Sequence, residues 1–161
     1  MLRRRKAMKI GEPKICLVAS AGGHLSQLLK MNDWSSYSNL ACVTTSETQR
    51  KKLSQLGRTY VVGESNREHP LQVFRVLMRC IGIVLRERPR FVISTGASVG
   101  CLICYLSKCL GARVLWMDSI TNVKKPSLSG RLVRHIADEF LVQWPELAER
   151  IPKAVYVGAV I

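Results

Sequence analysis

The sequence has few acidic residues, few aromatic residues and no long uninterrupted apolar segment. Asp and Glu total 11 against 25 Lys and Arg in 161 residues, a formal net charge of +14, and aromatic residues make up 6%. A membrane-spanning helix needs about 20 mostly apolar residues. The longest uncharged run, residues 91–107, is interrupted by Gly96, Gly100 and several Ser and Thr residues. The sequence therefore predicts no membrane span, and its charge favours an anionic partner: nucleic acid, a phosphorylated substrate or an acidic membrane.

The cysteines lack the spacing of a disulfide framework or a zinc site. They are Cys16, Cys42, Cys80, Cys101, Cys104 and Cys109. Most of them stand inside apolar runs, as reduced core cysteines do. Cys101 and Cys104 form a CxxC pair, but no second pair or spaced histidine completes four zinc ligands. We therefore predict a reducing compartment and no metal site, with a metal or redox role for this pair as the alternative.

The chain length fits one domain. We expect a basic N-terminal tail over residues 1–13 and a single domain over residues 14–161. Residues 3–6, Arg-Arg-Arg-Lys, have no apolar segment behind them and so do not form a secretory signal. The tail is either a disordered segment or a polybasic anchor, in which each basic residue adds about 1 kcal/mol of attraction to anionic lipid.

Short apolar segments rich in β-branched residues alternate with segments of helical period. Strands are expected at residues 14–20, 40–45, 59–63, 91–95, 113–117 and 139–143, with a further candidate at 154–157. Helices are expected at 24–31, 47–56, 71–88, 99–110, 128–136 and 145–150. Strands separated by helices form right-handed crossovers. The sequence thus predicts an α/β fold, a Rossmann-like and mostly parallel sheet with helices on both faces.

Ligands of such sheets bind beyond the carboxyl ends of the strands. The first strand is followed by Gly22, Gly23 and His24 at the start of a helix. Adjacent glycines permit a sharp turn and close approach of a ligand, and the helix N-terminus attracts anionic groups. His24 would project into the cleft as an acid, a base or a hydrogen-bond donor. The alternative is a glycine turn needed only for packing, with His24 as an ordinary helix residue.

Two other loops follow strands at the same edge. Gly96 and Ser98 come after the fourth strand, where small residues either leave room for a ligand near a helix N-terminus or allow the helix to pack closely on the sheet. Asp118 and Ser119 come after the fifth strand. A carboxylate there can bind a sugar hydroxyl, orient an imidazole or cap the following turn.

The segment 71–88 combines a basic stripe with an apolar remainder. Arg75, Arg79 and Arg86 recur at steps of four and seven, so they share one helical face. This pattern suits a helix at a membrane interface, with arginines on phosphates and apolar side chains in the acyl boundary. A buried helix whose only solvated face is basic has the same pattern.

Several strings, spread from Ile15 to the carboxyl end, resemble the Alg14 family and its bacterial exopolysaccharide relatives of the PssD type. They are Gly22-Gly23-His24, Arg67-Glu68, Asp118-Ser119-Ile120, Ser127-Leu128-Ser129-Gly130-Arg131, Gln143-Trp144-Pro145 and the segment from Pro152 to Gly158. The resemblance implies the N-terminal half of a GT-B glycosyltransferase, similar to MurG. It also implies a small Alg13-like or PssE-like partner subunit that binds most of the UDP-sugar donor, with no other cofactor.

The resemblance further implies roles for individual residues. His24 looks like a base or an orienting group near the acceptor hydroxyl, and Gly22 and Gly23 would let the loop approach the acceptor diphosphate or sugar. Arg67 and Glu68 look like acceptor-site or subunit-interface residues. Asp118 stands where relatives commonly carry Glu. The acceptor would be a sugar on a lipid diphosphate at the cytoplasmic membrane face, to which the protein attaches peripherally.

The reaction implied is inversion at the anomeric carbon, with a base on the acceptor and positive groups on the departing diphosphate. Because no Asp-x-Asp motif occurs in the sequence, we predict a metal-independent transferase that is inactive without its partner. The high positive charge also suits a nucleic-acid-binding domain, although aromatic residues are few and no RNP-like signature is present. A noncatalytic membrane scaffold is the third class; it would tolerate loss of His24.

Overall fold

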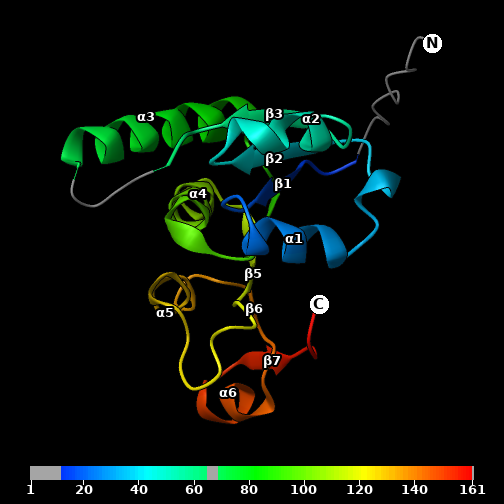
Figure 1. Ribbon diagram of the computed structural model, residues 1–161, viewed down its shortest axis with the longest axis vertical. Coiled ribbons are helices and arrows are strands. Elements are labelled where there is room, and N and C mark those ends of the chain that lie inside the picture. The colour runs from blue at the N-terminus through cyan, green and yellow to red at the C-terminus, as the bar shows by residue number, and fades with distance from the viewer. Residues whose placement is uncertain (1–11, 65–68, 161) are drawn as a thin grey trace.

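The computed structural model describes residues 12–64 and 69–160, and these form a single parallel sheet flanked by helices (Figure 1). The strands follow the order β3-β2-β1-β4-β5-β6-β7, and each neighbouring pair is parallel. Their bounds are β1 Ile15–Val18, β2 Leu40–Thr44, β3 Arg58–Val61, β4 Phe91–Ser94, β5 Arg113–Met117, β6 Glu139–Val142 and β7 Ala154–Tyr156. This arrangement confirms the predicted Rossmann-like α/β fold.

The helices between the strands match the predicted segments to within two residues at each end, except that α5 ends three residues early, one predicted helix is partly a 3₁₀ turn and one 3₁₀ turn is added. Their bounds are α1 Gly23–Lys30, α2 Arg50–Leu53, α3 Pro70–Glu87, α4 Ala97–Cys109, α5 Leu128–Val133 and α6 Pro145–Arg150. The helix expected at residues 47–56 is a short 3₁₀ turn, η2 (Glu47–Gln49), followed by the single turn of α2. A second 3₁₀ turn, η1 (Trp34–Ser36), was not predicted; the side chain of Asp33 caps it by accepting from the Ser35 amide.

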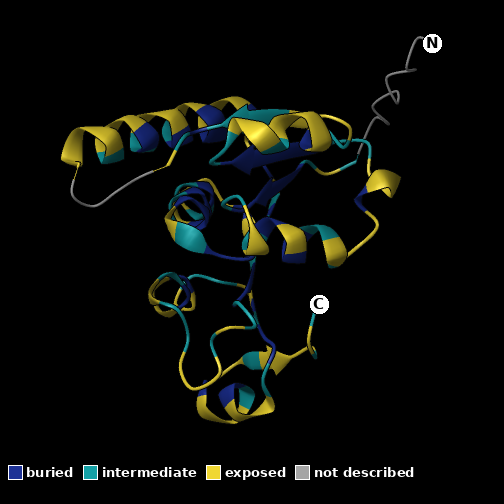
Figure 2. Cartoon of the chain, in the orientation of Figure 1, coloured by how far each residue is buried: buried dark blue, intermediate teal, exposed yellow. Residues whose placement is uncertain are grey.

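The central strands of the sheet are buried on both faces, as crossover helices require, whereas the edge strands β3 and β7 are partly exposed (Figure 2). Alternate residues of β1 point to opposite sides: Cys16 and Val18 join the cluster beneath α3 and α4, whereas Leu17 packs with Leu25 and Leu28 of α1. Burial on both sides explains the nearly continuous apolar runs of the central strands.

The cysteines of the described residues are free thiols. Cys16, Cys42, Cys80 and Cys104 are buried, and burial raises the pKa of Cys42 to about 12. These four are core residues, as expected. Cys109 is exposed, so it departs from the predicted pattern. No group of three or more His, Cys, Asp or Glu side chains in residues 12–64 and 69–160 is placed to hold a metal ion.

Strands β1 and β4 are neighbours at the centre of the sheet, with Val18 beside Ser94 at their carboxyl ends. From this point α1 packs in the cluster on one face of the sheet and α4 in the cluster on the other. Two neighbouring parallel strands whose connections diverge in this way open a crevice at the edge of the sheet. The loops at residues 19–22 and 95–96 therefore frame the candidate site.

Candidate functional site

His24 lies where the loops after β1 and β4 meet, and two hydrogen bonds join it to Thr95. The ring Nδ1 of His24 is 2.9 Å from the Thr95 carbonyl oxygen. The Thr95 hydroxyl in turn donates to the His24 carbonyl oxygen at 2.6 Å. The imidazole is half-buried, while Thr95 is fully buried. The structure thus places His24 at the carboxyl edge of the sheet, beside the end of β4, and holds it there through a residue 71 positions away in the sequence.

Gly96 lies against the His24 ring. A Cβ built on Gly96 would be 2.5 Å from Cε1 and 2.6 Å from Nδ1 of that ring, and the backbone φ of Gly96 is +142°. Only glycine is compatible with both conditions. The space that a side chain at Gly96 would take is occupied by the imidazole, so glycine here makes room for His24, and the role of Gly96 in ligand binding stays a prediction. Ser98, in the first turn of α4, is exposed.

The backbone conformation favours glycine at position 22 but not at position 23. Gly22 has φ +92°, which favours glycine on backbone grounds alone. Gly23 has no positive φ, and a Cβ at this position would meet nothing within 4 Å. The amide of Ala21 donates to the Thr45 hydroxyl at 3.1 Å, which fixes the loop to the end of β2. Space for a ligand therefore remains over Gly23.

The N-termini of α1 and α4 lie at this edge of the sheet, after β1 and β4 respectively. Neither helix has a side-chain cap or an acidic residue in its first turn. The first N–H groups of a helix have no partner within the helix, and they attract anions. Two such ends beside a histidine form a site suited to a phosphate-bearing ligand with a hydroxyl to be deprotonated.

Asp118 does not face this crevice. It is 1% exposed, and its carboxylate accepts hydrogen bonds from the Ser127 amide at 2.9 Å, the Ser127 hydroxyl at 2.7 Å and the Asn122 side chain at 3.2 Å. Ser119 bonds the Thr121 hydroxyl within the same loop at 3.0 Å. Of the three roles considered for Asp118, the geometry supports capping of the turn before α5. The expected cleft-facing catalytic carboxylate is corrected accordingly, because the donors of its own loop saturate this group.

Gln143 and Trp144, which directly follow β6, hold the same loop, and the resemblance assigned no individual role to either. Gln143 Nε2 donates to the Asp118 carbonyl oxygen at 2.9 Å, and its Oε1 accepts from the Val160 amide at 2.8 Å. Trp144 Nε1 donates to the Ile120 carbonyl oxygen at 2.7 Å. A polar pair directly after a buried strand was the available signal, since buried amides and indoles need partners.

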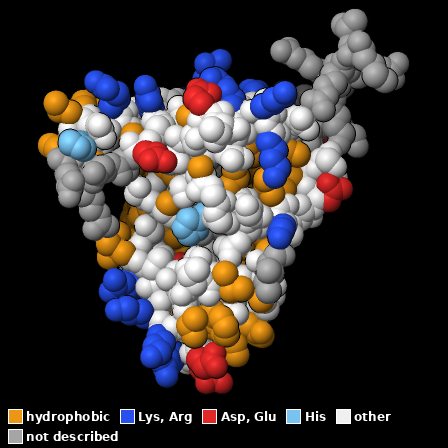
Figure 3. Space-filling view, viewed as in Figure 1, with side chains coloured by type: hydrophobic (Ala, Val, Ile, Leu, Met, Phe, Trp, Pro, Cys, Tyr) orange, Lys and Arg blue, Asp and Glu red, His pale blue; other side chains and the backbone are white. Residues whose placement is uncertain are grey.

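Helix α3 exposes apolar and basic side chains side by side. Leu71, Phe74, Met78 and Leu85 are 80%, 60%, 50% and 53% exposed. Together with the exposed Arg75 and Arg86 we call them the α3 outer face. Figure 3 shows basic side chains along the edge of the molecule that carries α3 and apolar ones at the free end of that helix.

The solvent-exposed side of α3 therefore carries apolar as well as basic side chains. This disfavours the alternative of a buried helix whose only solvated face is basic. Arg79 belongs to the predicted stripe but differs from its neighbours, because its Nη1 donates to the Val62 carbonyl oxygen at 2.8 Å. Within the ranges described, no helix is both long and apolar enough to cross a bilayer.

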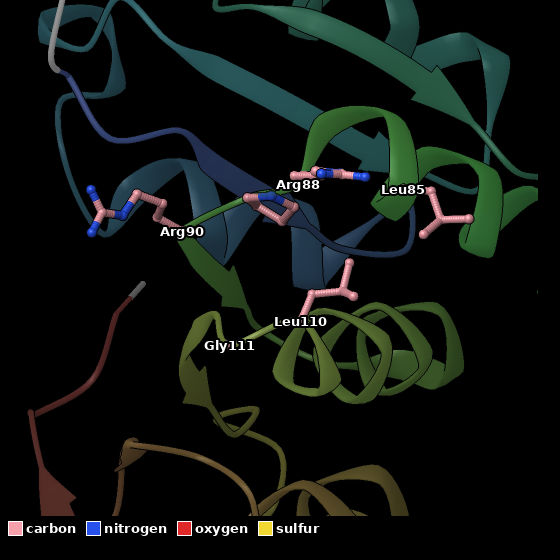
Figure 4. A pocket seen from close by; sticks show the side chains of 6 residues that line it. Leu85, Arg88, Arg90, Leu110 and Gly111 are labelled. Atoms are coloured by element: carbon pink, nitrogen blue, oxygen red, sulfur yellow. The ribbon is translucent and has the colours of Figure 1, made fainter.

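A separate hollow of about 380 Å³ lies at the opposite edge of the sheet (Figure 4). Its lining residues are Leu85, Arg88, Pro89, Arg90, Leu110 and Gly111, at the amino ends of β4 and β5. None of the predicted site residues lines it. Arg67 and Glu68 lie outside the described residues, so the structure places neither of them.

A family model described as oligosaccharide biosynthesis protein Alg14 like matches residues 24–160. The chain belongs to the Alg14 family. Mouse UDP-N-acetylglucosamine transferase subunit ALG14 is 26% identical over 180 residues, an alignment covering 92% of this chain and 83% of the mouse protein. The subunit of the same name from Yarrowia lipolytica is 26% identical over 167 residues, covering 100% of this chain and 74% of the yeast protein.

Solved structures of low sequence identity share the fold of this Alg14-family chain. MurG of Acinetobacter baumannii superposes with a TM-score of 0.69 at 14% identity, covering 91% of this chain and 45% of MurG. UDP-GlcNAc 2-epimerase of Methanocaldococcus jannaschii superposes with a TM-score of 0.65 at 16% identity, covering 90% of this chain and 45% of the epimerase. The chain thus has the fold of one lobe of these proteins and spans about half their length.

Proposed function

We propose that this Alg14-family chain is the acceptor-binding subunit of a two-part glycosyltransferase, which transfers a sugar from a UDP-sugar to a sugar carried on a lipid diphosphate. The observation that carries the proposal is His24, held at the crevice between β1 and β4 beside two uncapped helix N-termini. Such a site offers a base for a hydroxyl and amide donors for a phosphate. The product belongs to exopolysaccharide, capsule or lipid-linked oligosaccharide synthesis.

The partner in this proposal is a donor-binding subunit of the Alg13 or PssE type. Two observations support it: the chain matches one lobe of MurG, and its relatives are named as subunits. Their name makes UDP-N-acetylglucosamine the first donor to test. The UDP-sugar is a substrate held mainly by the partner, and we propose no other cofactor.

The chemistry follows from the position of His24. Its Nε2 accepts the proton of the acceptor hydroxyl while that oxygen bonds the anomeric carbon, and the bond from this carbon to the diphosphate breaks with inversion. UDP leaves with the bonding electron pair. Amide groups at the N-termini of α1 and α4 hold the acceptor diphosphate, whereas the charge of the departing UDP is stabilised by the partner. No metal ion takes part in the step as proposed.

Attachment to the membrane would place the acceptor beside this site. α3 begins directly after the loop that follows β3, so its first turns stand at the carboxyl edge of the sheet, the edge that carries His24. Leu71 and Phe74 are the most exposed apolar residues of that helix. Apolar side chains in the acyl boundary with arginines at the phosphates would anchor the protein peripherally at the cytoplasmic face.

Reconstitution tests the proposal. The full chain is co-expressed with a small Alg13-like or PssE-like subunit, and transfer is measured with UDP-N-acetylglucosamine, other UDP-sugars and lipid-diphosphate acceptors. We expect transfer only when both chains are present. Ordinary turnover by this chain alone, or no transfer by the stable complex with any donor, would overturn the proposal.

A matched pair of variants separates a transferase subunit from a membrane scaffold. His24→Ala in the complex should lower kcat by about 100-fold or more, the usual contribution of a general base. His135→Ala is the control, because His135 is exposed at the end of α5, remote from the crevice in the fold. A scaffold would retain full activity with either variant, and a nucleic-acid-binding domain would instead show tight gel-shift binding at moderate salt.

A further inference from the structure

We propose that Thr95 is a positioning residue that fixes both the tautomer and the orientation of His24, leaving Nε2 unprotonated and available to a ligand. The catalytic consequence rests on the function proposed above, whereas the tautomer itself is a property of the chain alone. Thr95 was not singled out by the sequence analysis.

The tautomer follows from the kind of atom that faces Nδ1. Nδ1 of His24 lies 2.9 Å from the main-chain carbonyl oxygen of Thr95. A carbonyl oxygen can only accept a hydrogen bond, so Nδ1 must carry the proton. A neutral imidazole has one N–H group, and its second nitrogen then keeps a free lone pair. Nε2 is thereby the basic atom of the ring.

Three constraints fix the ring in this orientation. The first is the Nδ1 hydrogen bond, and the second is Gly96, whose missing Cβ leaves room for the ring edge. The third is the Thr95 hydroxyl, which donates to the His24 carbonyl oxygen at 2.6 Å and so ties the first turn of α1 to the end of β4. Because Thr95 is 0% exposed, its hydroxyl serves this contact and not a substrate.

Nε2 remains available for a ligand. Among the residues that the structure describes, no hydrogen-bond partner of Nε2 is present, whereas the opposite nitrogen is bonded. Gly23, the first residue of α1, directly precedes His24, and apart from its chain neighbours and the α1 backbone no protein atom lies within 4 Å of where its Cβ would be. An acceptor hydroxyl that reaches Nε2 would thus meet a lone pair and not an N–H group.

Nuclear magnetic resonance of histidine ring nitrogens tests the tautomer directly. The full chain is labelled at histidine, and the His24 signals are assigned by their disappearance in His24→Gln. At a pH where the ring is neutral, we expect Nδ1 in the protonated range and Nε2 in the unprotonated range. The reverse assignment, or an equal mixture of the two tautomers, would overturn the proposal.

Variants of Thr95 test its positioning role. Thr95→Val keeps the shape of the side chain and the main-chain carbonyl but removes the hydroxyl that ties the first turn of α1 to Thr95. The Nδ1 hydrogen bond should then be made only part of the time, so the variant should show mixed His24 tautomers and a kcat of the complex lowered about 3- to 10-fold with little change in KM. Thr95→Ser keeps the hydroxyl and should restore both readouts. Thr59→Val in β3 is the control. It removes a hydroxyl that donates to the Gly57 carbonyl oxygen, and it should change neither kcat nor the His24 tautomer.

The two proposals fail in different ways. A wild-type complex that transfers sugar while His24 shows the Nε2–H tautomer would refute the positioning role and leave the transferase function intact. A chain with the expected tautomer that transfers no sugar with any partner would refute the function only. If Thr95→Val does not fold, the wild-type tautomer and the Thr95→Ser complex still decide the matter.

Discussion

Glu87 is a buried carboxylate that joins three elements at the amino edge of the sheet. It accepts a hydrogen bond from the Tyr60 hydroxyl of β3 and lies 3.1 Å from both Lys14 Nζ and Arg58 Nη2. Burial alone would raise the pKa of Glu87, but hydrogen bonds from Tyr60 and Lys14 and the charge of Arg58 outweigh it, so the pKa is lowered. The end of α3 is thereby tied to β3 and to the start of β1.

This network predicts a specific response to acid. A carboxyl group whose pKa is lower in the folded state than its ordinary 4.5 stabilises the fold above that value and loses its contribution as pH falls through the folded-state pKa. Glu87→Gln should therefore cost about 1–3 kcal/mol of unfolding free energy at neutral pH. As the pH falls from neutral to acid, the variant should also lose less stability than the wild type does. Urea unfolding at neutral pH and below pH 4.5 measures both effects.

An exposed glutamate supplies the control for Glu87. Glu47 pairs with Arg50 at 2.8 Å, but its side chain is 64% exposed, so Glu47→Gln should cost less than about 1 kcal/mol. Equal costs for the two variants would mean that the network around Glu87 does not stabilise the fold.

Substitution of Asp118 should lower the stability of the folded chain. Asp118→Ala leaves the Ser127 amide and hydroxyl and the Asn122 side chain without their acceptor, which should cost about 2 kcal/mol or more. Glu149→Ala on the exposed side of α6 is the control and should change little. Unfolding midpoints in urea decide the outcome. An Asp118→Ala chain of full stability whose complex lacks activity would restore the catalytic role that the sequence suggested.

At the scale of elements, the packing of α4 against the sheet depends on Gly100. A Cβ on this residue would lie 2.2 Å from the Ser94 hydroxyl and 3.4 Å from the Trp116 ring, both fully buried. The Ser94 hydroxyl also accepts from the Gly96 amide at 3.3 Å, so it cannot turn aside without loss. Close contact between α4 and β4 therefore requires glycine here.

Two glycine-to-alanine variants in long helices should consequently act in opposite directions. Gly100→Ala should destabilise the protein by about 1–3 kcal/mol because the helix must move away from the sheet. Gly82→Ala in α3 should stabilise it by about 0.5–1 kcal/mol, since its Cβ would meet nothing within 4 Å and alanine favours helix. Thermal unfolding of both variants measures the difference. A shift of the same sign in both would contradict the packing described for α4.

The elements that sequence reasoning identified best are those whose pattern does not depend on distant partners. β5 and α6 have the predicted bounds, because a continuous apolar run and an initial proline mark them locally. The segment at 47–56 departed from prediction, as only Leu53 of η2 and α2 is buried and little packing extends the helix. η1 depends on the Asp33 cap, a short-range signal that the apolar pattern does not contain.

The candidate site divides in the same way. Gly22, Gly23 and His24 were placed correctly at the sheet edge, since a loop after a parallel strand must lie there. The partner of His24 could not be inferred, because Thr95 reaches it across 71 positions of sequence and through a main-chain atom. Asp118 was placed at the correct edge, but its orientation depends on Asn122 and Ser127, which fold back over it.

At the scale of the whole molecule, positive charge and exposed apolar surface occur together on α3. A net charge of +14 attracts the chain to any anionic surface, but charge alone gives binding that salt screens. Apolar side chains on the α3 outer face would add a contribution that salt does not remove. The two contributions can therefore be separated by experiment.

Flotation of the full chain with vesicles tests the surface. We expect binding to vesicles rich in anionic lipid and little binding to neutral ones. Phe74 is 60% exposed, and burial of a phenylalanine side chain contributes about 1.5–3 kcal/mol, so Phe74→Ser should weaken binding about 10-fold or more at low and high salt alike. Tyr156→Ser is the control, because Tyr156 is 50% exposed on β7 at the far end of the sheet. Equal loss of vesicle binding in both variants would show that α3 is not the membrane-binding element. If neither variant weakens binding and salt abolishes it, charge alone causes the binding.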